Sequence, residues 1–163
     1  MRKVAAKSGL SLSNVQYHYR TRALLLIGIT DRHLAHCRES LITAAEPVDP
    51  LTLRNVLEIS LLNENVRATA GPFRDLFALA KTEPAVHQRL MAHFRDAHQQ
   101  LTALLGTIAP LPREELDEVA TIIMTALEGA YLISEAMPVS PERFVDRLDA
   151  TARIMLGQAP RSR

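Results

Sequence analysis

The fold of this chain is decided by residues 4–25, which read VAAKSGLSLSNVQYHYRTRALL. Val4, Ala5 and Ala6 predict a short helix, and Gly9 stands where such a helix would end in a left-handed residue, a conformation that glycine adopts cheaply. Ser11 and Ser13 are candidate N-caps for a second helix. The pattern therefore predicts two short helices joined by a tight turn.

The second helix is predicted to span residues 14–19. Val15 and Tyr19, four residues apart, would face inward. The residues left outside are polar or aromatic and include no acid: Asn14, Gln16, Tyr17 and His18. Asn and Gln side chains in the major groove can hydrogen-bond to adenine edges. We interpret this stretch as the second half of a helix-turn-helix; the alternative is an ordinary solvated helix face.

The charge of the chain is divided unevenly along its length. Residues 1–22 hold five basic residues and no acid, a charge of +5, and the first acid is Asp31. The other fourteen basic residues and all eighteen acids give the remainder a charge of −4. A basic end on an acidic body suits a protein that places that end on a polyanion, although a run of charge can also be plain surface.

The composition of the chain argues against a membrane protein and against a secreted, disulfide-bonded one. With 163 residues and 47% hydrophobic residues, the chain is long enough for one or two small domains with a core. It has no apolar run of membrane-spanning length and no signal-peptide pattern after Met1. The single Cys37 cannot form an intrachain disulfide. We therefore predict a cytoplasmic protein that does not enter a membrane.

The rest of the chain is predicted to be helical, because apolar residues recur at helical spacing between Pro and Gly breaks. Expected helix starts are Thr21 as an N-cap, Asp49-Pro50, the 82–84 segment, Pro112 and Ser140-Pro141. The helix after Pro50 is expected to continue towards Thr69 and to break at Gly71-Pro72, with a short helix over 73–81. The fold class is therefore all-α.

The helix predicted over 112–137 is apolar around most of its circumference. A helix of this kind is usually buried on two sides. Ala126, Gly129 and Ala130 would let another helix approach closely, and the alternative is ordinary core packing. We favour a dimer contact, because the final helix over 141–156 offers a second apolar stripe.

The N-terminal pattern and the all-helical body together resemble the tetracycline-repressor (TetR-like) family of bacterial transcription regulators. The resemblance rests on Ala6 to Ser11, Val15 to Tyr19, Thr21-Arg22 and Leu24-Leu25, with an echo at residues 126–129. Members carry a further helix, and the start of the next, before the position of Val4. We therefore expect the DNA-binding head present here to be partial.

The resemblance implies roles for individual residues. It implies a head over residues 1–30, including the start of a linking helix, and a helical ligand-binding and dimerisation domain over 31–163. The expected DNA contacts are Ser13, Asn14 and Gln16 near bases, with Tyr17, His18 and Arg22 near phosphates. The last two helices would pair across a twofold axis, and the expected dimer residues are Ile122, Ala126, Gly129, Ala130, Ile133, Leu148 and Ala152.

Other candidate sites are weaker. Phe73, His87, Met91 and Phe94 could line a chamber for a small-molecule effector, with His93 and His98 on the same helix; the alternative is ordinary surface or satisfied histidines. His33, His36 and Cys37 offer only two or three local ligands, so we predict no metal and read a packed thiol. No phosphate loop, nucleophile elbow or zinc-protease motif is present, so we predict no enzyme activity and no cofactor.

The sequence thus predicts a homodimeric, ligand-responsive regulator, a repressor, that binds double-stranded DNA at a palindromic operator. The alternative is a helical homodimer that binds a small apolar ligand or a protein partner without binding DNA.

Overall fold

The computed structural model describes residues 1–133, 136 and 138–158, and within them every regular element is a helix. This confirms the all-α prediction. The helices are α1 (Arg2–Lys7), α2 (Leu12–His18), α3 (Arg22–Ala45), α4 (Leu53–Leu62), α5 (Glu64–Ala68), α6 (Ala70–Ala80), α7 (Pro84–Ile108), α8 (Arg113–Ile133) and α9 (Pro141–Met155).

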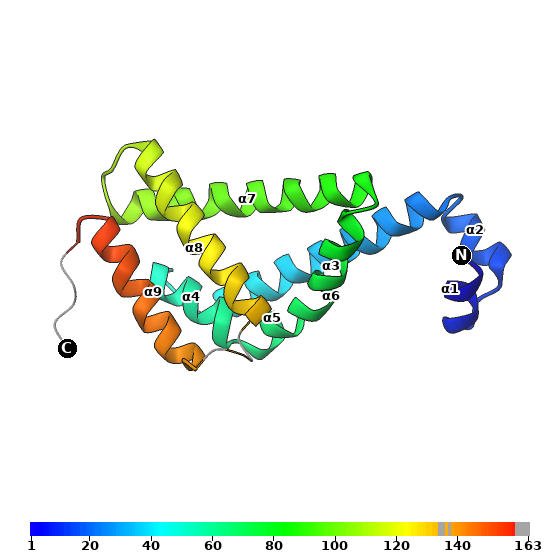
Figure 1. Ribbon diagram of the computed structural model, residues 1–163, viewed down its shortest axis with the longest axis horizontal. Coiled ribbons are helices and arrows are strands. Elements are labelled where there is room, and N and C mark those ends of the chain that lie inside the picture. Colours follow the sequence, from blue (N-terminus) through cyan, green and yellow to red (C-terminus); the bar gives the residue numbers. More distant parts are fainter. Residues whose placement is uncertain (134–135, 137, 159–163) are drawn as a thin grey trace.

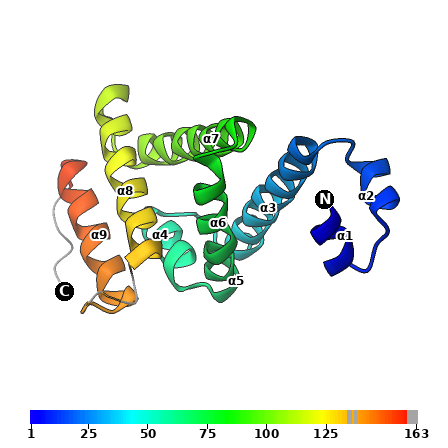
Figure 2. The same ribbon diagram turned by 45° about the vertical axis from the view of Figure 1, so that its right-hand side comes forward.

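The first two helices form a small head at one end of the molecule. Gly9 ends α1 with φ of +68°, as predicted, and the Ser11 hydroxyl accepts a hydrogen bond from the backbone N–H of Asn14 at the start of α2. The Thr21 hydroxyl likewise caps α3 by accepting from the Leu24 N–H. Figures 1 and 2 show the head projecting from the body on the N-terminal part of α3. The long helix α3 thus connects the head to the body.

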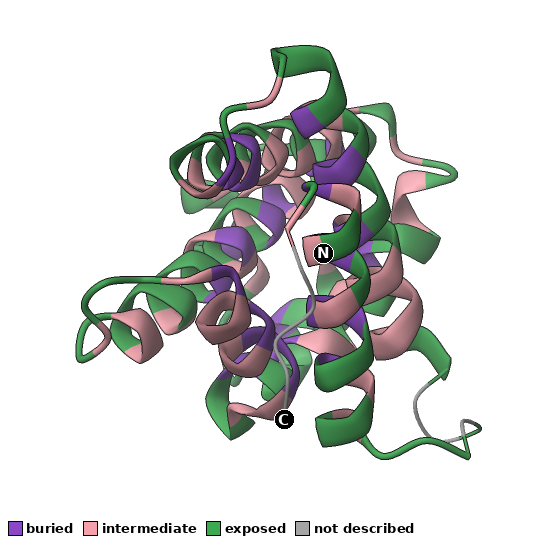
Figure 3. Ribbon diagram, turned by 90° about the vertical axis from the view of Figure 1, so that its left-hand side faces the viewer, coloured by how far each residue is buried: buried purple, intermediate pink, exposed green. Residues whose placement is uncertain are grey.

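The body has two apolar cores that share α7. One core lies between α4, α8, α9 and the C-terminal half of α7, and its fully buried members include Leu57, Leu105 and Ile123. The other lies between α3, α6 and the N-terminal half of α7, around Leu34, Leu76 and Leu90. Buried residues line the inner sides of the helices in Figure 3. The 25-residue α7 therefore braces both halves of the body.

Two predicted helix boundaries around α4 are wrong. The cap of α4 is Thr52 rather than Asp49, because the Thr52 hydroxyl and the Asn55 side chain bind each other's backbone N–H groups in a capping box. The helix does not continue to Thr69: it ends at Leu62, and the Asn63 side chain accepts hydrogen bonds from the Asn65 and Val66 N–H groups to start α5.

The break or kink predicted at Gly71-Pro72 is found slightly earlier, at Thr69 between α5 and α6, and α6 corresponds to the short helix predicted over 73–81. Gly71 and Pro72 both lie in the first turn of α6. A proline there costs little, because N–H groups in the first turn of a helix have no intrahelical partner.

The C-terminal boundaries agree in part with prediction. Ser140 caps α9 with Pro141 at its first position, and Gly157 follows the helix with φ of +69°. The Gln158 amide donates to the Ile108 carbonyl at 3.0 Å and so ties the end of α9 to the end of α7. The sequence predicts a loose tail over 158–163; this is wrong at Gln158, which the bond to Ile108 holds, and residues 159–163 lie outside the described residues. The predicted extension of α8 to Met137 also falls largely outside them.

No helix in the described part of the chain combines the length and the apolar character that crossing a bilayer requires.

Candidate DNA-reading face and ligand cavity

The exposed face of α2 carries the residues predicted to touch DNA. Ser13, Asn14, Gln16, Tyr17 and His18 are all exposed, whereas Val15 between them is buried. Tyr17 is 83% exposed and its ring meets that of His18 edge-on, with 5.2 Å between centroids. The Ser13 hydroxyl is 2.9 Å from that of Ser11. The five side chains therefore form one polar surface, open to solvent, at the far end of the molecule.

Tyr19 and Gly28 hold the head against α3. Tyr19 follows α2 and is half-buried. Its ring lies so close to Gly28 that a Cβ atom built on Gly28 would stand 2.6 Å from Tyr19 Cε1. The buried apolar side chains of this region are only Ala5, Val15 and Leu25. Because so little apolar surface is buried here, the close approach of Tyr19 to α3 is central to the position of the head.

Arg22 is the first residue of α3 and lies at the end of that helix next to α2. Its guanidinium, 62% exposed, forms an ion pair with Glu83 at the start of α7. A phosphate contact by Arg22 would therefore compete with, or share, this ion pair. The contact also joins the base of the head to the body.

A large cavity, about 1300 Å³ in volume, opens between α3, α4, α6, α7 and α8. Three of the four residues predicted to line a ligand chamber line it: Phe73, Met91 and Phe94. Phe73 packs against Phe77 and Phe94, with centroids 5.6 and 5.8 Å apart, so the cavity has an aromatic wall.

The prediction that His87 lines the chamber is wrong. His87 is exposed and does not border the cavity. Val86 and Leu90 point into the core, and the next residue along a helix is rotated by about 100° from its neighbour, which turns His87 outward. His93 and His98, the other two candidate histidines of this helix, do border the cavity.

Sequence reasoning missed several polar groups that line the cavity, above all Glu128 on α8. Burial raises the pKa of the Glu128 carboxyl to about 7. Burial also raises the pKa of the Tyr131 phenol, whose hydroxyl donates to the Ser60 carbonyl. The signal was present in the sequence, since Glu128 is the one charged residue between Val119 and Ile133.

The His33–Cys37 pair lies beside this cavity on α3. The Cys37 sulfur is 3.4 Å from His33 Nε2, and burial raises the pKa of the thiol and lowers the pKa of the imidazole. His36 is exposed on another side of the helix. Among the residues that the structure describes, no three His, Cys, Asp or Glu side chains come together as a metal site. Cys37 is therefore a packed thiol that is hydrogen-bonded to His33.

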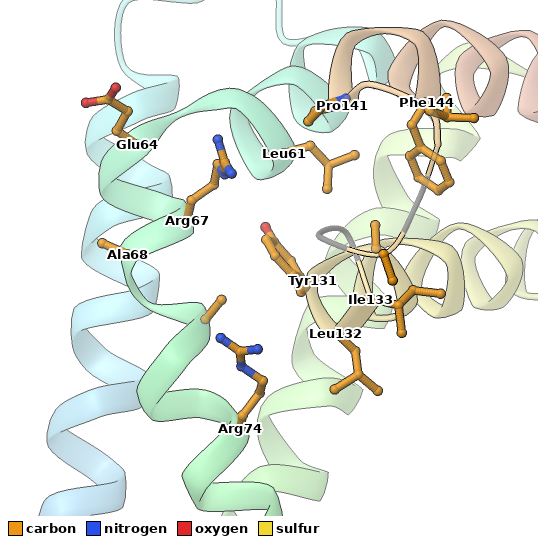
Figure 4. A pocket seen from close by; sticks show the side chains of 14 residues that line it. Leu61, Glu64, Arg67, Ala68, Arg74, Tyr131, Leu132, Ile133, Pro141 and Phe144 are labelled. Carbon is orange, nitrogen blue, oxygen red and sulfur yellow. The ribbon is translucent and has the colours of Figure 1, made fainter.

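A second cavity of about 610 Å³ adjoins the first and shares Tyr131, Leu132 and Arg74 with it. Figure 4 shows Arg67 and Arg74, from α5 and α6, on the wall opposite Tyr131 and Leu132. Both arginines are exposed. The smaller cavity thus carries two exposed arginines and Glu64, beside the larger and mostly apolar cavity.

The predicted dimer residues divide into two sets. Leu148 and Ala152 belong to the stripe by which α9 packs on α4, and they are buried within the chain, so their predicted role at a dimer surface is wrong. Ile122 and Ile133 are exposed, and a Cβ on Gly129 would meet nothing within 4 Å. Ala126 and Ala130 are half-buried against the core. α8 packs against α7 and also against α4 and α9, in line with its expected burial on two sides, and exposed apolar side chains remain on it at Ile122 and Ile133.

The buried Glu128 predicts how stability depends on pH. The unfolded carboxyl loses its proton near pH 4.5 and the folded one near 7, so the folded state binds more protons in between and stability falls as pH rises through this window. Glu128→Gln should remove this contribution to the slope and raise the free energy of unfolding at pH 8 by about 3 kcal/mol. Urea unfolding at pH 4.5 to 8 measures it. Glu118→Gln, at an exposed acid on the same helix, should leave the slope intact; equal effects of the two variants would contradict the prediction.

An uncharacterised HTH-type transcriptional regulator from the dhlA 5′ region of Xanthobacter autotrophicus is 30% identical over 156 residues, which span 91% of this chain and 75% of that protein. No protein-family model matches the chain.

Two solved structures share the fold. A transcriptional regulator from Rhodococcus sp. Rha1 has a TM-score of 0.76 at 21% identity, over 99% of this chain and 87% of that one. A protein named as a transcriptional regulator from Pseudomonas aeruginosa PAO1 has a TM-score of 0.72 at 18% identity, over 96% of this chain and 79% of that one. At these identities the likeness concerns the fold.

Proposed function

This chain belongs to the helix-turn-helix (HTH-type) transcriptional regulators, and on that premise we propose that it is a TetR-like repressor that binds a palindromic operator as a homodimer and releases it on binding a small molecule. The observation that carries the proposal is the exposed polar face of α2, set on a head without acids at the far end of α3. Such a face is open to a DNA groove, and among the described residues the one ion pair between an acid of the body and a proposed DNA-binding residue is that of Glu83 with Arg22.

The residues of this face suit distinct parts of a DNA duplex. Asn14 and Gln16, with Ser13 beside them, present amide and hydroxyl groups that hydrogen-bond to base edges in the major groove. Tyr17 and His18 stand at the edge of the same surface, and Arg22 follows at the start of α3, where each would meet phosphates. The charge of +5 over residues 1–22 adds affinity that does not depend on base sequence.

Dimerisation in this proposal uses an exposed face of α8, where Gly129 also borders the large cavity and Ile133 the smaller one. Ile122, Gly129 and Ile133 are spaced by seven and four residues, which puts them on one side of the helix. Two exposed isoleucines flanking an open glycine favour close contact with the same face of a second copy. A twofold axis there would present two α2 helices to successive turns of the duplex.

Coupling between ligand and DNA would pass through α3. This helix begins at Arg22 beside the head, and its C-terminal half borders the large cavity at Cys37, Leu41 and Ile42. A ligand that binds better when α3 is displaced would change the separation of the two heads. Linkage requires that DNA then weakens ligand binding by the same factor.

The test is an electrophoretic shift on the DNA that flanks the protein's own coding region. Gln16→Ala should change the preference between base sequences, because it removes a base-reading amide. Arg22→Gln should weaken binding to all sequences alike and reduce the dependence on salt, because it removes a phosphate contact. Two chains should bind per palindromic site.

The assay includes a control variant, and one outcome would contradict the proposal. Ser140 lies far from the head, so Ser140→Ala serves as the control and should leave binding unchanged. A protein that sediments as a dimer but shifts no DNA would favour the alternative, a helical dimer without DNA binding.

A further inference from the structure

Glu128 places a carboxyl group in the mostly apolar wall of the large cavity. It is largely buried, it lies within the apolar part of α8, and it borders the cavity beside Leu127 and Tyr131. No hydrogen bond or ion pair to its carboxylate is found within residues 1–133, 136 and 138–158. A buried carboxylate without a partner is costly, so a group of this kind in a cavity indicates that its partner is a ligand.

Among the described residues, none of the other charged side chains that border the cavity pairs with Glu128. Arg74, Arg95 and Arg113 are exposed at the rim. Arg113 donates to Asp117 on its own helix at 3.3 Å. The ionisable groups that face Glu128 are the Cys37 thiol from α3 and the Tyr131 phenol from α8, and burial raises the pKa of both, so both are neutral near pH 7. His98 and Asp117 also border the cavity and pair with each other. Among the described residues, the Glu128 carboxylate is therefore not paired with a cation.

The aromatic wall borders the same cavity as this carboxylate. Cys37 is hydrogen-bonded to His33, and the His33 ring packs on Phe73 with 5.8 Å between centroids. Phe73, Phe77, Phe94 and His93 form one aromatic group, and burial lowers the pKa of His93, which keeps that ring uncharged at neutral pH. The faces of phenyl rings attract cations and bind apolar groups.

We propose that the large cavity binds an apolar or aromatic organic cation, with the Glu128 carboxylate as its counter-ion and the Phe73–Phe77–Phe94 wall as its apolar contact. This ligand class rests on the proposed function as a ligand-responsive regulator. A cavity of about 1300 Å³ has room for a molecule of drug size. An anion would bring a second negative charge next to a buried carboxylate, and a neutral ligand would leave that carboxylate unpaired.

The experiment uses a pair of probes of nearly identical shape and opposite charge, tetraphenylphosphonium and tetraphenylborate. Isothermal titration at pH 8 should give tighter binding of the phosphonium ion. Glu128→Gln should weaken phosphonium binding by about tenfold or more and should leave borate binding equal or stronger. Glu118→Gln, which removes the same charge from the exposed side of α8, should change neither affinity beyond about twofold.

A second readout concerns protons rather than affinity. Because the pKa of Glu128 is about 7, a cation binding at pH 7 should displace roughly half a proton from the wild-type protein. Titration in buffers with different ionisation enthalpies measures this number. Glu128→Gln should displace none from this site, so a variant that merely distorts the cavity is distinguished from one that removes the counter-ion.

The outcomes separate this inference from the proposed function. Phosphonium binding that is no tighter than borate binding, or that survives Glu128→Gln unchanged, overturns the ligand class, and the DNA shift assay on the same preparation then shows whether the regulator proposal stands by itself. Loss of phosphonium binding in Glu128→Gln, in a protein that shifts no DNA, supports the ligand site and overturns the regulator proposal.

Discussion

Gly28→Ala is expected to weaken DNA binding by about tenfold or more while the body stays folded. The Cβ atom of alanine at this position would lie 2.6 Å from Tyr19 Cε1 and 3.1 Å from the Tyr19 hydroxyl oxygen, so the ring must move away from α3. Overpacking of this kind costs about 1–3 kcal/mol. Only Ala5, Val15 and Leu25 are buried in this region, so the head has little other packing with which to compensate.

The same substitution should not reduce the stability of the body. Alanine is a better helix former than glycine by about 1 kcal/mol, and Gly28 lies inside α3, so the helix itself gains. Operator affinity and the thermal midpoint of the body should therefore move independently. Fluorescence anisotropy with labelled duplex DNA measures the first, and circular dichroism at 222 nm measures the second.

Gly71→Ala is the matched control for this prediction. Gly71 is also helical, in α6, and a Cβ atom there would meet nothing within 4 Å. This variant should keep full DNA affinity. If Gly28→Ala bound DNA as well as Gly71→Ala does, Tyr19 would not be the contact that positions the head.

Local signals in the sequence predicted most of the fold because helix ends are set by residues close together in the chain. Thr21, Ser140 and Gly157 act at the ends that their side chains or backbone preferences favour. The wrong boundaries also arose from local signals. The helix predicted to start at Asp49-Pro50 starts instead at the Thr52–Asn55 capping box, and Asn63 starts a new helix before Gly71-Pro72 is reached. Choosing between two good signals a few residues apart depends on packing, which spacing does not reveal.

The candidate sites were harder to predict because they are formed by residues distant in sequence. The α2 face is local, and its exposed residues followed from the spacing of Val15. The cavity brings Cys37, Phe73 and Glu128 together from three helices, and only their aromatic part was foreseen. Leu148 and Ala152 show the converse error: an apolar stripe on α9 predicts burial equally well against α4 or against a second copy.

Leu57→Ala is expected to destabilise the body by about 2–5 kcal/mol, the largest effect on stability among the substitutions considered. Leu57 is 0% exposed and lies in α4, where the helix packs against α8 and α9. Truncation to alanine removes apolar contacts and leaves a cavity that rigid neighbours fill only in part. Because domains are stable by only about 5–15 kcal/mol, the midpoint of thermal unfolding should fall by roughly 5–20 °C.

Leu24→Ala removes the same atoms from a leucine that is 48% exposed on α3, and it should change stability by less than about 1 kcal/mol. Urea unfolding followed by circular dichroism measures both variants. Because Leu57 lies in the core shared by α4, α8 and α9 and the head is joined to the body mainly through α3, amide exchange in α2 should be nearly unchanged by Leu57→Ala under native conditions. Equal losses from Leu57→Ala and Leu24→Ala would mean that α4 does not anchor this core.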